Sequence, residues 1–286
     1  MFSIIVLTHL WPSRISQCLD SLCKIEGDFI TEVIIVNDGG PDIIKDVVAK
    51  YEPSLPVKYI KNLKNEGVGF SRNVGIKAAK GKYISFFADN YSIPKDYFSK
   101  ASSFLVNYDV VASKVVTKGK GIAGKIIDNY FQLIIERWKQ DATKVGDGYE
   151  GEGFPAGSAS SFKKSVFDAV GFFDTSLKTG EDSDYNARMD KQNKKRIYVP
   201  DIIVIRTEHG SLGSVLRKHF RYGKDFYISS KKKNRVFIFR EELLYSMYIT
   251  KEYFNFKKPL KYFLFFLLMH LSFRLGQIDA WRRKRK

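Results

Sequence analysis

The strongest candidate for chemistry in this 286-residue chain is a group of three acidic residues within four positions. They are Glu181, Asp182 and Asp184, which directly follow Gly180. The pattern is typical of a helix that begins at the cluster, because acidic side chains are stabilised at the positive end of a helix. Helix capping alone explains such a group, but a carboxylate in this place can also take a proton from a hydroxyl group.

A second set of polar residues stands at the ends of short apolar runs. It consists of Thr8, Asp38 and the pair Asp89-Asn90. In an open parallel sheet the ligand crevice lies outside the carboxyl ends of the strands, so we expect these side chains to line one crevice. Asp and Asn are also ordinary turn residues, and each position taken alone is explained as a turn.

The elements around these residues alternate between apolar runs and helical patterns. We expect strands over residues 3–7, 32–36, 57–60 and 83–88, and helices over residues 15–22, 42–51 and 70–80. Gly81 is predicted to close the last of these helices, and Pro94 to begin another. The alternation predicts an α/β fold with a mostly parallel sheet that carries helices on both faces. An NAD-dependent enzyme is not expected, because no GxGxxG fingerprint follows the first strand.

Composition limits the class of protein. The chain is 44% hydrophobic and 15% aromatic, which is enough apolar material for a sizeable core, and its two cysteines form no disulfide framework or zinc motif. Of the formal charge of +17, residues 231–286 carry a net +11, from 15 basic and 4 acidic residues. We therefore expect one domain over residues 1–230 and a basic, aromatic, helical extension over residues 231–286.

Five motifs occur in an order that resembles one family of enzymes. They are SIIVLTHLWPSRISQCLDSL, EVIIVNDGG, NEGVGFSRNVGIKAAKGKYISFFADN, GSASSFKKSVFDAVGFFD and GEDSDYNARM. Over about residues 1–225 the chain resembles the inverting family 2 glycosyltransferases of the Rossmann-like GT-A fold. The resemblance implies that the first half of the sheet binds a nucleotide-sugar donor, for which a UDP-sugar is the first candidate. It implies that the second half binds an acceptor.

The resemblance assigns the polar strand ends to the donor. Asp38 matches the aspartate that contacts the nucleotide base, and Arg72 matches an arginine that also reaches the nucleotide. Asp89 matches the first aspartate of the family's DxD motif, and Thr8 and Asn90 are expected beside it. For Arg72 the alternative is a solvated helix face.

The resemblance also assigns the acidic group. Asp182 matches the general base, which takes the proton of the acceptor hydroxyl in a single displacement that needs no protein nucleophile. Glu181 is expected to touch the acceptor, and Asp184 is expected to remain structural. The alternative stays that all three residues only cap the helix.

The leaving nucleoside diphosphate needs a metal ion or cations to meet its developing charge. The family implies Mg²⁺ or Mn²⁺, but Tyr91 stands where the second DxD aspartate is expected. Asp89 and His209 remain as candidate ligands, so we expect an ion that binds appreciably only with the donor. Arg217 and Arg221, four positions apart on one predicted helix face, are candidates for a diphosphate clamp, and a solvated face is the alternative.

The C-terminal extension predicts contact with a membrane surface. Residues 260–275 are rich in Phe and Leu, but only 12 uncharged residues separate Lys261 from Arg274, and a span needs about 20. An in-plane helix followed by the basic run 282–286 suits an anionic leaflet, which predicts a cytoplasmic protein on the inner face of the membrane. The alternative is a helix packed on the domain, followed by a disordered basic end. Nucleic acid is not an expected partner, because no recognised binding motif is present.

Two rival functions stand beside the synthesis of a surface glycan or a lipid-linked glycan at the membrane. In the first, the same chemistry acts on a soluble small-molecule acceptor. In the second, the chain is an inactive nucleotide-sugar-binding module, which Tyr91 permits and the Glu181-Asp182 pair opposes. Donor turnover separates the enzyme from the binding module, and flotation with anionic vesicles separates the two enzymes.

Overall fold

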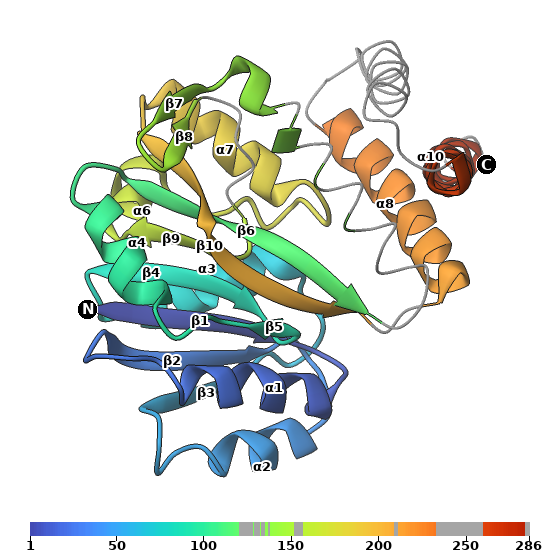
Figure 1. Cartoon of the computed structure of the whole chain (residues 1–286). Coiled ribbons are helices and arrows are strands. Elements are labelled where there is room, and N and C mark those ends of the chain that lie inside the picture. The colour runs from blue at the N-terminus through green and yellow to red at the C-terminus, as the bar shows by residue number, and fades with distance from the viewer. Residues whose placement is uncertain are drawn as a thin grey trace. The chain divides into compact units, whose positions relative to one another are not determined.

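The structure is a computed structural model that describes residues 1–119, 128, 132, 135–136, 138–151, 157–208, 211–232 and 260–283. The strands are β1 Phe2–Thr8, β2 Ile30–Asn37, β3 Val57–Lys61, β4 Tyr83–Ala88, β5 Tyr91–Ser92, β6 Val110–Gly119, β7 Thr143–Val145, β8 Gly148–Glu150, β9 Ser160–Lys163 and β10 Arg196–Glu208 (Figure 1). The helices are α1 Pro12–Leu22, α2 Ile43–Ala49, α3 Val68–Ala78, α4 Tyr97–Leu105, α6 Ser165–Val170, α7 Glu181–Lys191, α8 Leu212–Lys232 and α10 Leu260–Arg283.

In the described part of the chain the strands form one ten-stranded sheet. Its order is β3-β2-β1-β4-β9-β6-β10-β8-β7, and β5 pairs with β10. The pairs β1–β2, β1–β4 and β2–β3 are parallel, whereas β9 runs antiparallel to β4 and β6. The predicted α/β fold is confirmed, and its parallel half is the part built from continuous apolar runs. This half brings the carboxyl ends of β1, β2 and β4 to the same edge of the sheet.

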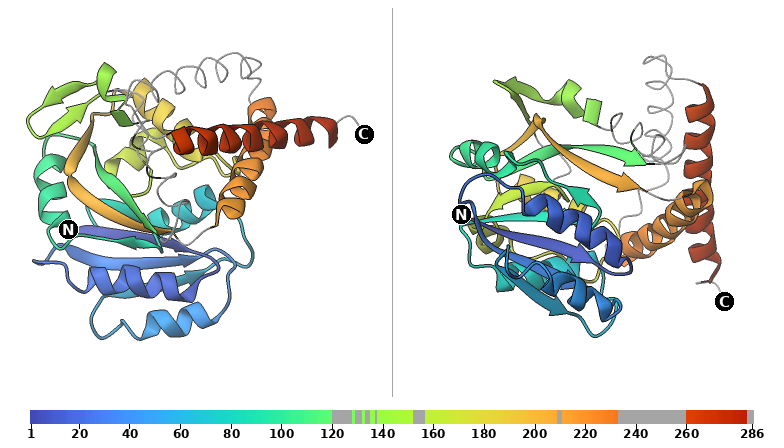
Figure 2. Two further views of the ribbon diagram at one scale, coloured as in Figure 1. Left: turned by 45° about the vertical axis from the view of Figure 1, so that its right-hand side comes forward. Right: turned by 60° about the horizontal axis from the view of Figure 1, so that its bottom comes forward.

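Helices cover both faces of the parallel half. Ile15 of α1 joins the core on the face of β1 that carries Ile4. α3 lies against the opposite face at Gly75, where a Cβ would be 2.6 Å from the side chain of Ile5. Neighbouring strand residues point to opposite faces, so α1 and α3 lie on different sides of the sheet. Figure 2 shows α1 and α2 side by side.

Two element boundaries differ from the prediction. α3 ends at Ala78, and the next residue is already extended, so Gly81 does not cap this helix. Gly81 is instead required for close approach to β1, because a Cβ there would lie 2.5 Å from the Ser3 nitrogen. Its own N–H donates to Ser3 Oγ at 2.7 Å. α4 begins at Tyr97, whose N–H donates to the carbonyl of Pro94, so Pro94 precedes the helix by a turn.

The end of β10 returns to the first helix of the chain. Gln17 of α1 donates from Nε2 to Ser92 Oγ at 3.0 Å and to Thr207 Oγ1 at 2.7 Å. The Thr207 N–H donates to the carbonyl of Asn90, and the Asn90 side-chain amide donates to the carbonyl of Thr207, both at 2.9 Å. These bonds fix the end of β10 to the segment that follows β4.

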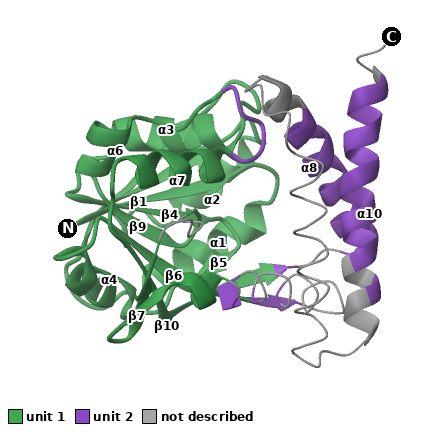
Figure 3. Cartoon of the chain, turned by 90° about the horizontal axis from the view of Figure 1, so that it is seen from above, with its two compact units in different colours: residues 1–116, 138–175, 181–207 green, residues 117–137, 176–180, 208–286 purple. Residues whose placement is uncertain are grey.

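The chain divides into two compact units, coloured green and purple in Figure 3. The first holds residues 1–116, 138–175 and 181–207, and the second holds residues 117–137, 176–180 and 208–286. In the second unit α8 and α10 touch through glycines, since a Cβ on Gly223 would overlap the Phe273 carbonyl and one on Gly276 would overlap the Phe220 carbonyl. The predicted division at residue 230 falls inside α8 and stays a prediction. Of the helices that the structure describes, none combines the length and the apolar character needed to cross a membrane.

Candidate active site

The carboxyl ends of β1 and β4 bring Thr8 and Asp89 together. Thr8 Oγ1 donates to Asp89 Oδ2 at 2.8 Å. Both residues are buried, and burial raises the pKa of the Asp89 carboxyl, against the hydrogen bond from Thr8, which lowers it. Asn90 is used differently, because its side-chain amide is bonded to β10. Asp89 is therefore the carboxylate that this edge of the sheet offers to a ligand.

Asp38 follows β2 and shapes the loop that leads into α3. Its Oδ1 accepts hydrogen bonds from Asn62 Nδ2 at 2.8 Å and from the Glu66 N–H at 2.9 Å. Its Oδ2 accepts the Gly67 N–H, also at 2.9 Å. Gly67 has φ +99°, a conformation that favours glycine, and it directly precedes the helix. Asp38 is thus more than a local turn residue, and its contact with a nucleotide base stays a prediction.

The N-termini of α3 and α7 meet at a glycine. A Cβ on Gly69, in the first turn of α3, would lie 3.5 Å from the Cβ of Glu181. Glu181 is the first residue of α7, as the acidic cluster predicts. Because the N-terminal end of a helix carries partial positive charge, two such ends converge at this point. The two helix ends therefore direct partial positive charge toward Glu181.

Arg72, one turn into α3, is the cation of this junction. It is 3% exposed, so the alternative of a solvated helix face is excluded. Its Nη1 lies 3.2 Å from Glu181 Oε1 in an ion pair that joins α3 to α7. The guanidinium also lies over the rings of Phe86 and Phe173, at 5.6 and 5.0 Å from their centres. Its Nε is buried and has no hydrogen-bond partner among the described residues.

Glu181 and Asp182 are neighbours in different environments. Burial raises the pKa of Glu181, the charge of Asp182 adds to this rise, and Arg72 opposes it. Asp182 is half-buried, and its Oδ1 accepts the Ser183 N–H at 2.8 Å. Its Oδ2 faces Gly157, where a Cβ would lie 3.5 Å from this oxygen and 3.9 Å from Arg72 Nη2. Because residue 157 is a glycine, there is room beside the Asp182 carboxylate oxygen and the Arg72 guanidinium group.

Because Tyr91 stands where a second carboxylate is expected, its environment bears on whether the described residues suit a divalent ion. Its side chain is 6% exposed, and Arg206, Ser158 and Arg72 are close enough to act on the charge of its phenol. Burial raises the pKa of the phenol, so Tyr91 is neutral at pH 7. Mg²⁺ and Mn²⁺ are hard cations that prefer oxygen ligands, carboxylates above all. The segments that the structure describes hold no group of three or more His, Cys, Asp or Glu residues that could bind a metal. Asp38, the other carboxylate at this edge, is bonded to Asn62 and to the loop before α3, so with Asp89 alone the described residues do not fit a two-carboxylate site.

The remaining predicted residues are not among the described residues of the first unit. Arg217 and Arg221 are exposed on α8, in the second unit, and their role as a diphosphate clamp stays a prediction. His209 lies outside the described residues, so its role as a metal ligand, and with it the predicted ion, also stays a prediction.

Three residues of the site were not predicted from the sequence. Gly157 and Ser158 open one of the five motifs that carry the resemblance, but no role was assigned to either residue. Arg206 lies directly opposite Tyr91 in the antiparallel β5–β10 ladder, and opposite residues of such a pair project on the same face. A two-residue strand gives no periodicity, so the sequence did not reveal which strand would face Tyr91.

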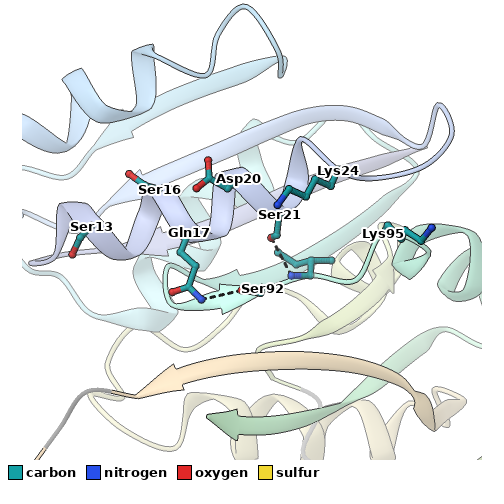
Figure 4. Close-up of a pocket in the computed structure, with 9 residues that line it drawn as sticks. Ser13, Ser16, Gln17, Asp20, Ser21, Lys24, Ser92 and Lys95 are labelled. Atoms are coloured by element: carbon teal, nitrogen blue, oxygen red, sulfur yellow. Dashed lines mark hydrogen bonds between the residues drawn. The ribbon is translucent and has the colours of Figure 1, made fainter. Parts of the chain in front are cut away.

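The hollow with a volume of about 520 Å³ lies elsewhere on the first unit (Figure 4). α1 and the segment after β5 form its walls, with Gln17, Asp20, Lys24, Ser92 and Lys95 among the lining residues. No predicted site residue lines it, and its charged groups lie at its rim. The side chains of the candidate site converge near Gly157, and they do not line this hollow.

Comparisons with known proteins point to one family. The family model described as "Glycosyl transferase family 2" matches residues 3–171. EpsH of Bacillus subtilis is 36% identical over 95 residues, which are 33% of this chain and 27% of EpsH. Staphylococcus aureus TarS, a poly(ribitol-phosphate) β-N-acetylglucosaminyltransferase, is 31% identical over 128 residues, 43% of this chain and 22% of TarS. The chain thus spans about a quarter of EpsH and a fifth of TarS in length.

Similar solved structures show the fold. TarS residues 1–349 in complex with UDP-GlcNAc superpose with a TM-score of 0.57 at 20% identity, covering 98% of this chain and 89% of that one. The mannosyltransferase PcManGT of Pyrobaculum calidifontis, in complex with GDP-Man and Mn²⁺, gives a TM-score of 0.61 at 18% identity, covering 80% and 64%. At these identities the likeness concerns the fold, and the predicted GT-A fold is confirmed.

Proposed function

This chain belongs to glycosyl transferase family 2, and we propose that it moves a sugar from a nucleotide-sugar donor to a hydroxyl acceptor, with inversion at the anomeric carbon. The observation that carries the proposal is the meeting of Arg72, Glu181 and Asp182 at Gly157, beside the strand ends of a parallel sheet. A UDP-sugar is the proposed donor, because the similar TarS structures hold UDP and UDP-GlcNAc. The acceptor proposed is a surface glycan or a lipid-linked glycan.

In this proposal Asp182 is the general base. The acceptor oxygen forms a bond to the anomeric carbon while Asp182 Oδ2 takes the hydroxyl proton. The bond from the anomeric carbon to the diphosphate oxygen breaks, and its electron pair stays on the diphosphate. The Ser183 N–H holds Oδ1, which leaves Oδ2 directed at the open side of Gly157. Glu181, fixed by Arg72, contacts the acceptor and orients it.

The donor lies across the carboxyl ends of β1, β2 and β4 in this proposal. Asp38 and the loop that it organises contact the base, and Thr8, Asp89 and Asn90 line the crevice. A divalent ion, when bound, would add positive charge at the diphosphate, with Asp89 and His209 as its proposed ligands. The proposed transfer does not depend on that ion, because the described residues do not fit its usual site.

A panel of nucleotide sugars tests the proposal. Each is added to the protein with and without Mn²⁺, and thermal stability and nucleotide release are followed. A ligand at 100 times its dissociation constant stabilises a protein by about 2.7 kcal/mol, which a thermal shift detects. Stabilisation with release of the nucleotide supports the enzyme. Stabilisation without any turnover, over a broad range of acceptors, would support the inactive binding module instead.

Replacing Asp38 by alanine is expected to weaken nucleotide binding at least about tenfold, whatever sugar is attached. The change removes a proposed base contact and three hydrogen bonds to the loop, each worth about 1 kcal/mol or more. Calorimetry with the free nucleoside diphosphate measures the loss. Asp28→Ala, at an exposed residue of the same unit, is the matched control. Unchanged affinity in Asp38→Ala would remove Asp38 from the donor site.

One face of α10 supports the proposed membrane contact. The face opposite α8 carries side chains that are 39% to 55% exposed: Leu264, Leu267, Leu268, Leu271, Leu275, Ile278 and Trp281. Their spacing of three and four residues places them on one side of the helix. Arg282 and Arg283 follow at its end. An exposed leucine face beside basic residues suits a helix that lies in the plane of an anionic membrane surface, and we place the protein on the cytoplasmic leaflet.

The triple variant Leu268→Gln, Leu271→Gln, Leu275→Gln is expected to lose at least about tenfold in affinity for anionic vesicles. Burial of one leucine side chain contributes about 1.5–3 kcal/mol, and three are removed. Flotation with vesicles at moderate salt measures binding, while turnover of a soluble acceptor analogue should stay unchanged. Leu63→Gln with Val106→Gln, at two exposed apolar residues of the first unit, is the control. Full flotation of the triple variant would favour the soluble-acceptor enzyme.

A further inference from the structure

Tyr91 belongs to the hydrophobic core, and the charged groups that act on its phenol are two arginines. It stands on β5 directly opposite Arg206 of β10, so both side chains project on the same face of the sheet. Burial raises the pKa of its phenol, and Arg206, Ser158 and Arg72 oppose this rise. A second DxD carboxylate at this position would be neutralised by the two guanidinium groups and would hold a metal ion poorly. A divalent cation would itself be repelled by them.

The backbone that carries Arg206 is rigidly placed at the ligand edge of the sheet. Thr207, the next residue, exchanges two hydrogen bonds with Asn90 and accepts one from Gln17. Asn90 follows Asp89, the buried carboxylate at the end of β4. The backbone of Arg206 is therefore fixed. Its side chain is only half-buried, which leaves the guanidinium accessible from the crevice. All of these residues belong to the first unit.

A second observation points to a missing ligand. Arg72 is 3% exposed, and its Nε–H has no acceptor among the described residues. Buried donors are rarely left without an acceptor, and each such group calls for an explanation. An anionic oxygen of a bound ligand would provide the acceptor. The unpaired donor lies in the same group of residues as Tyr91 and Gly157.

We propose that Arg206, which lies opposite Tyr91, binds the diphosphate of the donor, and that its positive charge takes the place of the divalent ion that a second DxD carboxylate would hold. The inference rests on the proposed function and deepens it. When the bond to the anomeric carbon breaks, the diphosphate gains one negative charge, and a guanidinium meets it with two parallel N–H donors. The hydrogen bonds of the neighbouring Thr207 fix the backbone of Arg206 before the donor arrives, which lowers the ordering cost of binding.

Calorimetry with uridine, UMP and UDP in excess EDTA tests the inference. Wild-type protein should bind UDP without a divalent ion. Arg206→Gln should weaken UDP binding by about 10–100-fold, as expected for lost charged hydrogen bonds, and should leave uridine binding unchanged. Retained uridine binding shows that the variant is folded. Arg206→Lys should recover part of the loss, and Lys50→Gln, which removes one exposed cation at the end of α2, should lose nothing. The guanosine series replaces the uridine series if GDP is the tighter ligand.

A double variant asks whether the metal site can be restored. Tyr91→Asp combined with Arg206→Gln should bind UDP at least about tenfold more tightly with Mn²⁺ than in EDTA, whereas wild-type protein should change less than about threefold. Wild-type affinity that collapses in EDTA and returns with Mn²⁺ would overturn the inference, as would unchanged UDP binding in Arg206→Gln. If folded wild-type protein binds neither UDP nor GDP under either condition, the donor site itself is wrong, and the proposed function falls with it.

Discussion

Asp182→Asn is expected to slow sugar transfer by a factor of about 100 to 10,000, which is the usual contribution of a general base. The asparagine side chain has the same shape, and its amide oxygen can still accept the Ser183 N–H that Asp182 Oδ1 accepts now. It cannot take a proton from the acceptor. Donor affinity should change by less than about threefold, because only the proton acceptor is lost. Turnover of a soluble acceptor analogue and calorimetry with the donor measure the two quantities.

Asp184→Asn is the matched control for this experiment. Asp184 lies in the same turn of α7, but its carboxylate accepts a hydrogen bond from Arg188 Nε at 3.1 Å and is not directed at Gly157. Its replacement should leave most of the activity. If Asp182→Asn lost donor binding while staying folded, Asp182 would belong to the donor site. If turnover persisted, Glu181 would become the candidate base.

Arg72→Met is expected to cost about 3–5 kcal/mol of the free energy of unfolding, the range for breaking a buried ion pair from one side. The variant leaves Glu181 buried without its cation, so the pKa of Glu181, already raised by burial, should rise further. A carboxyl group whose pKa is higher in the folded state favours folding at low pH, and this contribution is lost as the pH rises through the folded-state pKa. The destabilisation should therefore be larger at pH 8 than at pH 5. Urea denaturation at both pH values measures it.

The double variant Arg72→Met, Glu181→Gln separates stability from function. Removing the stranded charge should recover much of the stability, since a neutral pair leaves no buried ion. Turnover should stay low, because the acceptor contact and the guanidinium beside Gly157 are both absent. A double-mutant cycle gives the coupling energy of the pair. If Arg72→Met alone lost less than about 1 kcal/mol, the ion pair would not be the link between α3 and α7 that the structure describes.

The parallel half of the fold was predictable because its information is local. The run 83–88 is apolar except for Ser85 and coincides with β4, and the spacing of Ile15, Cys18, Leu19 and Leu22 identified the buried side of α1. Gly81 was assigned wrongly because a glycine after a helical pattern commonly caps it. Its actual constraint, the close approach to Ser3, joins residues 78 positions apart and leaves no mark in the local sequence.

The positions of the candidate residues were predictable where they open an element or end one. The acidic cluster placed Glu181 and Asp182 at the start of a helix, and the apolar run placed Asp89 at the end of a strand, whereas their roles came from the family resemblance and stay predictions. Arg206 was missed, and the partner of Arg72 was not foreseen, because both depend on pairings between distant segments. The Arg72–Glu181 pair spans 109 residues, and only the packing of α3 on α7 determines it.

The hydrogen bond from Gln17 to Thr207 has a consequence for the synthesis of the chain on the ribosome. Its two partners are 190 residues apart. At about 5–20 residues per second, a ribosome needs about 10–40 s to synthesise the chain between them. During that interval α1 and the first parallel strands are already available to pair, while the strand that carries Arg206 does not yet exist. We therefore expect nucleotide binding by the nascent chain to begin only after β10 has been synthesised. A ribosome that stalls before residue 206 would leave a sheet without Arg206, the proposed ligand of the diphosphate.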